Sequence, residues 1–94
     1  MALYLISYDI ADKDAFEYQP LWDELKNIGA VRILYSEWVV KGDVNQSANI
    51  YEKLAPLTTM KDRLLVQELT NDAAWDKLLI SDDAFRKLLA SARG

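Results

Sequence analysis

Cysteine and histidine are both absent from the 94-residue chain. Without them the protein has no disulfide bond, no catalytic thiolate and no zinc site built from sulfur or imidazole ligands. Proton transfer between two imidazoles is excluded for the same reason. Chemistry in this chain therefore depends on carboxylates, lysine, tyrosine, hydroxyl groups or a metal-bound water.

Long apolar runs are absent as well. No stretch reaches the roughly 18 apolar residues that a membrane-spanning helix needs. No basic segment precedes an apolar one near the first residue, as it would in a secretion signal. We therefore expect a cytoplasmic protein that has no membrane partner.

Hydrophobic residues, in contrast, make up 51% of the chain and include three Trp, five Tyr and two Phe. Disordered chains contain far fewer of these residues, so a packed core is expected. The length suits one domain, which is just large enough to fold alone. The composition thus predicts a single small folded domain.

Negative charge is concentrated near the N-terminus, while the formal net charge of the whole chain is −4. In residues 1–28 the acidic side chains outnumber Lys13 and Lys26; they are Asp9, Asp12, Asp14, Glu17, Asp23 and Glu24. Such a cluster repels the phosphates of bare nucleic acid, which bind through lysine and arginine. It attracts divalent cations, which prefer carboxylate oxygens.

The first half of the chain predicts a strand and a helix. Residues 3–8 are apolar and aromatic on both strand faces, and Asp9 ends this strand. Pro20 is suited to the first turn of a helix, and Gly29 to its end. The apolar face of that helix is expected to contain Leu21, Trp22, Leu25 and Ile28.

Two further strands are predicted in residues 31–40, with a bend at Tyr35 and Ser36. Either Asn45 or Ser47 is expected to cap a second helix that ends at Pro56. Its inward residues are predicted to be Ile50, Tyr51 and Leu54. Residues 64–69 read as a fourth strand.

The last 24 residues predict two short helices, the first capped by Asn71 or Asp72 and the second by Ser81. The whole order up to residue 70 is β, α, β, β, α, β. We therefore expect an α+β protein in which residues 1–70 form a ferredoxin-like antiparallel sheet with two helices on one face. Residues 71–94 are expected to be a helical C-terminal extension of the same compact unit.

The predicted strands carry apolar residues on both faces, so the sheet face without helices is expected to be apolar. Exposed apolar patches of this kind usually mark interfaces. We predict a two-fold homodimer packed sheet on sheet. The alternative is that the C-terminal helices cover this face.

Several of these residues resemble a known family. The segment YLISYDI, the helix closed by Gly29, and the pattern RxxxSxW formed by Arg32, Ser36 and Trp38 resemble the small CRISPR-associated spacer-acquisition proteins. That family is often described as an endoribonuclease, and VapD-type toxins share its superfamily fold. The likeness covers residues 3–69.

The resemblance implies a nucleic-acid-binding homodimer with an integrase-type protein partner. The aspartates that end the first strands would hold a Mg²⁺ ion across the two-fold axis, a role that falls on Asp9. Mg²⁺ prefers oxygen ligands and can activate a water toward a phosphodiester. Ser36 would then assist catalysis, and Arg32 would contact nucleic acid.

The chain also departs from the family pattern. Leu34 replaces a glutamine and Trp38 a phenylalanine, and the loop after Asp9 has Lys13 as its only cation. The alternative function is therefore a non-catalytic dimeric interaction or regulatory module that retains only the fold.

Each candidate residue also has an ordinary interpretation. Asp9 would end its strand by accepting hydrogen bonds from nearby backbone N–H groups. Arg32 would pair with Glu37 across the strands. Ser36 would be part of a turn, and Trp22 and Trp38 would belong to the core.

Overall fold

A computed structural model describes residues 1–10, 15–70 and 72–93, with the backbone alone described at residues 15–17 and 93. The elements, in chain order, are β1 (Ala2–Asp9), α1 (Ala15–Asn27), β2 (Val31–Leu34), β3 (Glu37–Gly42), α2 (Ser47–Leu54), a short 3₁₀ helix η1 (Ala55–Leu57), β4 (Arg63–Leu69) and α3 (Asp82–Arg93). Asp12, Lys13 and Asp14 of the acidic loop, and Asn71 as a predicted cap, lie outside the described residues.

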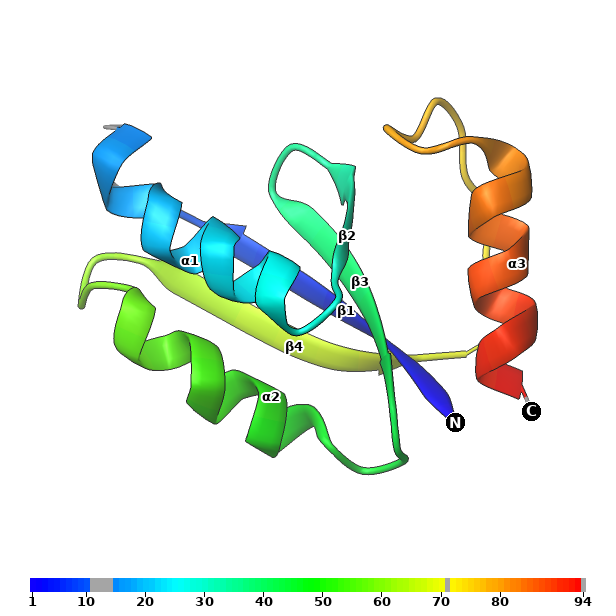
Figure 1. Cartoon of the computed structure of the whole chain (residues 1–94), viewed down its shortest axis with the longest axis horizontal. Helices are drawn as coiled ribbons and strands as arrows, with labels where there is room; N and C mark the ends of the chain where they lie inside the picture. Colours follow the sequence, from blue (N-terminus) through cyan, green and yellow to red (C-terminus); the bar gives the residue numbers. More distant parts are fainter. Residues whose placement is uncertain (11–14, 71, 94) are drawn as a thin grey trace.

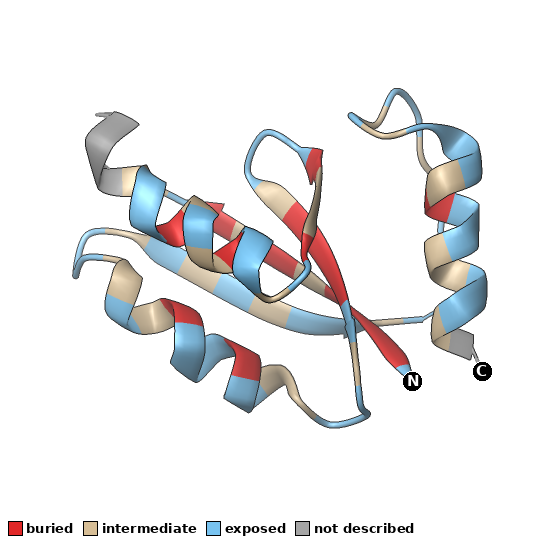
Figure 2. Ribbon diagram, viewed as in Figure 1, coloured by how far each residue is buried: buried red, intermediate tan, exposed pale blue. Residues whose placement is uncertain are grey.

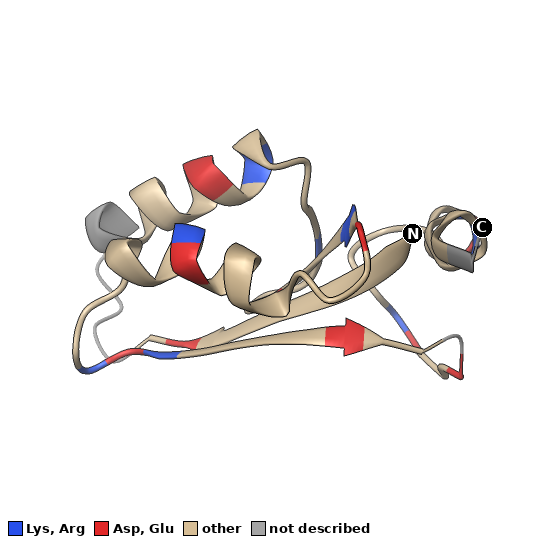
Figure 3. Cartoon of the chain, turned by 90° about the horizontal axis from the view of Figure 1, so that it is seen from below, with Lys and Arg blue, Asp and Glu red and all other residues tan. Residues whose placement is uncertain are grey.

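The four strands form one antiparallel sheet in the order β2-β3-β1-β4. β1 is therefore a central strand, paired with β3 on one side and β4 on the other. Helices α1 and α2 lie side by side over one face of the sheet, and α3 lies toward one end of it, where it contacts β1 and β3 (Figures 1 and 3). The structure confirms a small α+β fold.

The sheet face beneath α1 and α2 holds the larger core. Figure 2 shows buried residues along β1 and β3 and on both helices. Tyr4, Ile6 and Tyr8 of β1 point into it because alternate residues of a strand share a face. The helices contribute residues four positions apart, which lie on one side of a helix. These helical residues are Leu21, Leu25, Ile50 and Leu54.

The opposite face holds a second, smaller core. Leu3, Ile33 and Val39 of the sheet are buried there against Phe85 of α3. Partly buried residues of the C-terminal extension complete it; they include Trp75, Leu78, Ile80, Leu88 and Leu89. The extension therefore covers part of the face that the sequence predicts to be apolar.

Helix α1 begins five residues before Pro20, earlier than predicted. Pro20 lies inside the helix and cannot donate a backbone hydrogen bond there. The end of the helix agrees with the prediction, since Gly29 has a left-handed φ of 85°. The N–H groups of Gly29 and Ala30 donate to the carbonyl oxygens of Lys26 and Leu25 at 3.1 and 2.9 Å, as in a Schellman motif.

Helix α2 differs from the prediction in its first residue and in one inward position. Its N-cap is Gln46, without a side-chain capping bond, and neither Asn45 nor Ser47 takes that place. Tyr51 is 46% exposed, while Ile50 and Leu54 are buried. Residues 50 and 54 are one turn apart, but residue 51 is rotated by about 100° from residue 50 and so faces solvent.

The first of the two predicted C-terminal helices is not formed. Residues 72–80 are irregular, and Lys77 has a left-handed φ of 55°, a conformation that a regular helix excludes. The N–H of Leu79 donates to the carbonyl oxygen of Ile33 in β2 at 2.9 Å. The second predicted C-terminal helix is formed and is α3. Its predicted cap is confirmed, because the hydroxyl of Ser81 accepts a hydrogen bond from the N–H of Ala84 at 3.1 Å.

Within the part of the chain that the structure describes, no helix combines the length and the apolar character that crossing a membrane requires.

Candidate functional site

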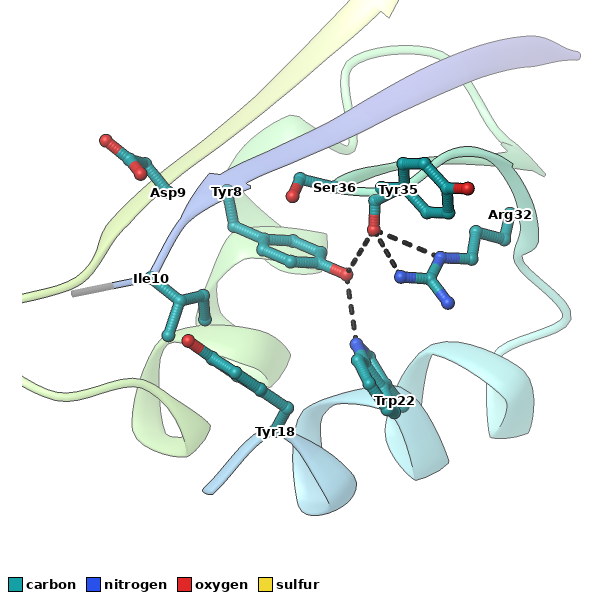
Figure 4. Close-up of a pocket in the computed structure, with 8 residues that line it drawn as sticks. All are labelled: Tyr8, Asp9, Ile10, Tyr18, Trp22, Arg32, Tyr35 and Ser36. Carbon is teal, nitrogen blue, oxygen red and sulfur yellow. Dashed lines mark hydrogen bonds between the residues drawn. The ribbon is translucent and has the colours of Figure 1, made fainter. Parts of the chain in front are cut away.

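A pocket of about 430 Å³ opens at the end of β1, between α1 and the β2–β3 turn. It is lined by Tyr8, Asp9, Ile10, Tyr18, Trp22, Arg32, Tyr35 and Ser36 (Figure 4). The three site residues predicted from the sequence all belong to this lining. The pocket therefore brings Asp9, Arg32 and Ser36 together from three separate segments of the chain.

The hydroxyl group of Tyr8 ties the walls of the pocket together. It accepts hydrogen bonds from the indole N–H groups of Trp22 and Trp38, at 3.0 and 3.1 Å. It also donates to the carbonyl oxygen of Tyr35, at 3.4 Å. Satisfied buried networks of this kind hold side chains in one arrangement. Residues from α1, β1, β3 and the turn are thus linked through one oxygen atom.

Arg32 lies on the same face of the sheet as this network, because it is paired with Trp38 in the register. Its Nε donates to the carbonyl oxygen of Tyr35 at 3.0 Å, and Nη2 donates to the same oxygen. Its guanidinium carbon lies 5.1 Å from the ring centre of Trp22 and 5.9 Å from those of Tyr35 and Trp38. Such distances permit cation–π attraction.

No carboxylate of the described residues pairs with Arg32. The predicted cross-strand pair with Glu37 is wrong, since Glu37 is opposite Ser7 and therefore lies on the other face. Among the described residues, no carboxylate compensates the charge of the guanidinium at the pocket wall, and its Nη1 donates to none of them. A fixed, unpaired guanidinium can bind an anion with little loss of side-chain entropy.

Asp9 ends β1 directly opposite Arg63 of β4. Nη1 of Arg63 donates to Oδ2 of Asp9 at 3.2 Å, and the two side chains are 84% and 72% exposed. The Asp9 carboxylate points away from Arg32 (Figure 4). Asp9 thus accepts from a side chain, where its ordinary interpretation predicts backbone N–H groups.

As a site for Mg²⁺, the described residues around Asp9 offer few ligands. The described residues contain no group of three or more carboxylates that could hold a metal ion. Asp9 also has the positive charge of Arg63 beside it, which opposes cation binding. Within the described part of the chain, an ion at Asp9 would therefore need further ligands, from water or from a second copy.

Ser36 is exposed in the two-residue turn between β2 and β3. Its carbonyl oxygen accepts a hydrogen bond from the N–H of Tyr8 at 3.1 Å. Its hydroxyl makes no hydrogen bond to a described residue, so a turn role and a substrate role are both compatible with its position.

The sequence analysis did not single out the aromatic lining. Tyr8, Tyr18 and Tyr35 were not proposed as site residues, and Trp22 was assigned to the core. Trp38 is buried as predicted, whereas Trp22 is partly buried and lines the pocket. The signal available in the sequence was the position of Tyr35 in the turn of a tight hairpin, three residues after Arg32. In the structure Tyr35 is 79% exposed.

No protein-family model matches the chain.

Proposed function

We propose that the chain is a nucleic-acid-binding protein with a ferredoxin-like fold, similar to the spacer-acquisition family. The element order β1, α1, β2, β3, α2, β4 supports the fold assignment, as do the two helices over one face of an antiparallel sheet. The proposed location is the cytoplasm, and the proposed working form is a homodimer that can dock an integrase-type protein.

The observation that carries this proposal is the state of Arg32. Its guanidinium is fixed by Tyr35 and by aromatic rings, has no carboxylate partner among the described residues, and faces a pocket. Arginine is well suited to phosphate because its planar N–H groups match phosphate oxygens. A phosphate group of a nucleic acid is the ligand that fits this charge.

The uncovered part of the second face supports the homodimer. Ser7, Asp9, Glu37 and Leu65 lie on the side of the sheet opposite to α1 and α2, and Leu65 is 52% exposed. A two-fold axis near this end of β1 would bring two copies of Asp9 close together. Two carboxylates at such an axis repel each other, so they would need a shared cation or proton.

Binding to labelled RNA and DNA, measured by fluorescence anisotropy at low and high salt, tests the proposal. We expect Arg32→Gln to weaken binding by about tenfold or more, because a charge-assisted bond to phosphate is lost. Arg86→Gln, which removes the same charge from α3, is the matched control and should bind as the parent does. If the parent binds no nucleic acid, the proposal is wrong.

Cleavage is tested separately, by incubating RNA or DNA with Mg²⁺ or Mn²⁺. If the chain is a metal-dependent nuclease that uses Asp9, Asp9→Asn should abolish cleavage and leave binding intact. Cleavage that survives this substitution would remove Asp9 from catalysis.

A second candidate function is a non-catalytic dimeric module. The ion pair between Asp9 and Arg63 favours it, because this pair occupies the carboxylate that the chemistry would need. A stable dimer that neither binds nor cleaves nucleic acid would select this alternative.

A further inference from the structure

We propose that the pocket at the end of β1 binds one unpaired nucleobase, stacked on its aromatic lining, with the adjoining phosphate at Arg32. This inference rests on the proposed nucleic-acid binding and makes it more specific. It predicts a preference for single strands, whose bases are accessible, over duplexes, whose bases are already stacked.

The aromatic composition of the walls is the first argument. Tyr18 and Trp22 of α1 are stacked on each other, with ring centres 5.9 Å apart and planes inclined by 26°. Tyr35 extends from the β2–β3 turn on the opposite side of the pocket (Figure 4). Every base has a flat π-face, and aromatic side chains that line a groove are typical platforms for single-stranded nucleic acid.

The exposure of Tyr35 is the second argument. Its side chain is 79% exposed, although its own carbonyl oxygen is held by Arg32 and Tyr8. The backbone of the turn is therefore fixed while the ring remains available. A large aromatic side chain loses little entropy on binding, because it has only two side-chain torsions.

The third argument combines size and charge. A volume of about 430 Å³ lies in the range of small-molecule sites and exceeds what one water or ion needs. The stacked rings suit a planar apolar ligand. The guanidinium of Arg32, which pairs with no carboxylate of the described residues, suits a negative charge next to that ligand. A nucleotide unit has both features within its own dimensions.

The distribution of charge favours contact with one nucleotide over contact with several phosphates along a duplex. In Figure 3, Lys and Arg form short, separate bands that alternate with acidic or uncharged stretches of the ribbon. A duplex-binding surface normally neutralises several phosphates along a groove. A pocket that takes one base and one phosphate does not need such a surface.

The experiment compares the binding of four probes, of which the three strands have the same length. They are a short single strand, the same strand with abasic sites, the corresponding duplex, and a free nucleoside monophosphate. We expect the base-bearing single strand to bind about tenfold more tightly than the abasic strand, because each stacked base adds that order of affinity. The slope of log K against log salt should correspond to one or two phosphates, between about −0.7 and −1.4.

Tyr35→Ala is the main variant, because its side chain is exposed and its loss should not affect folding. We expect it to remove most of the preference for base-bearing strands. Tyr51→Ala, which removes an exposed tyrosine from α2, is the matched control and should keep the preference. Quenching of tryptophan fluorescence by the nucleoside monophosphate, lost in Trp22→Phe, reports stacking at the pocket itself.

The outcomes distinguish a failure of the base-pocket inference from a failure of the proposed nucleic-acid binding. Equal binding of duplex, abasic and base-bearing strands would overturn the inference and leave nucleic-acid binding intact. Quenching by the monophosphate without binding of any strand would keep the base pocket and overturn the proposed function. If neither strands nor the monophosphate bind, both are wrong.

Discussion

The two faces of the sheet are covered in different ways. On the first face, α1 and α2 pack on Tyr4, Ile6 and Tyr8 with leucines and isoleucine spaced one helical turn apart. On the second face, α3 and the irregular segment before it cover Leu3, Ile33 and Val39. The first cover is made of helices that connect strands of the sheet, and the second of a segment that follows the last strand.

This difference shows in the burial of the side chains. Leu21, Leu25 and Leu54 on the first face are 0% exposed, whereas Leu88 and Leu89 of α3 are only partly buried. Since hydrophobic stabilisation grows with the apolar area removed from water, the first face should contribute more to folding. The second face should open at a lower free energy.

A matched pair of substitutions tests this comparison and should give the largest effect. Leu25→Ala, in α1, is expected to lower the free energy of unfolding by about 2–5 kcal/mol, because it leaves a cavity in a fully buried site. Leu88→Ala, in α3, should cost about 1 kcal/mol, because less area is lost. Chemical denaturation measures both, and equal losses would contradict the ranking of the two faces.

Much of the first face could be predicted from the sequence. The strands, the hairpin at Tyr35 and Ser36 and the helix end at Gly29 follow local rules, because they depend on residues within one turn or one strand. Tyr51 was assigned inward because it is apolar, although the one-turn spacing of Ile50 and Leu54 leaves it outside.

The second face and the site depended on contacts between distant residues. The segment before Ser81 carries apolar residues that also suit a helix, but its Leu79 bonds to Ile33, almost half the chain away. Similarly, no local pattern pairs Asp9 with Arg63, since the register of β1 and β4 creates that contact. The pocket depends on Tyr8 accepting from two indoles, which only the folded chain brings together.

Tyr4 offers a sharper test of the first face, because its hydroxyl is the polar centre of that core. It donates to the carbonyl oxygen of Asp43, accepts from the N–H of Gln46 at 2.9 Å and lies 3.1 Å from Oε1 of Glu68. Tyr4→Phe should lower the free energy of unfolding by about 1–3 kcal/mol, because these partners remain without their bonds.

The same residue predicts a dependence on pH. Burial raises the pKa of the Tyr4 hydroxyl above its ordinary value of 10.0, an effect that the neighbouring Glu68 reinforces. The unfolded chain then ionises this tyrosine at lower pH than the folded protein does, so stability should decrease as pH rises above about 10. The free energy of unfolding of Tyr4→Phe should decrease less steeply with pH over that window. If denaturation curves at several pH values give the same slope for the parent and the variant, Tyr4 is not the cause.

The smallest effect is expected at the open end of the second face, where Asp9 and Arg63 form an exposed ion pair. Asp9→Asn should change the free energy of unfolding by less than about 1 kcal/mol, since such pairs are screened by water and cost side-chain entropy. Thermal melts of Asp9→Asn, Arg63→Gln and the double variant measure the coupling between the two residues. A coupling near zero would show that the pair has no structural role. Breaking the pair would then cost little, and the Asp9 carboxylate would be available to bind a metal ion at the dimer axis. A large coupling would instead show that this end of the sheet depends on the pair for its stability, and a metal ion at Asp9 would have to compete with Arg63.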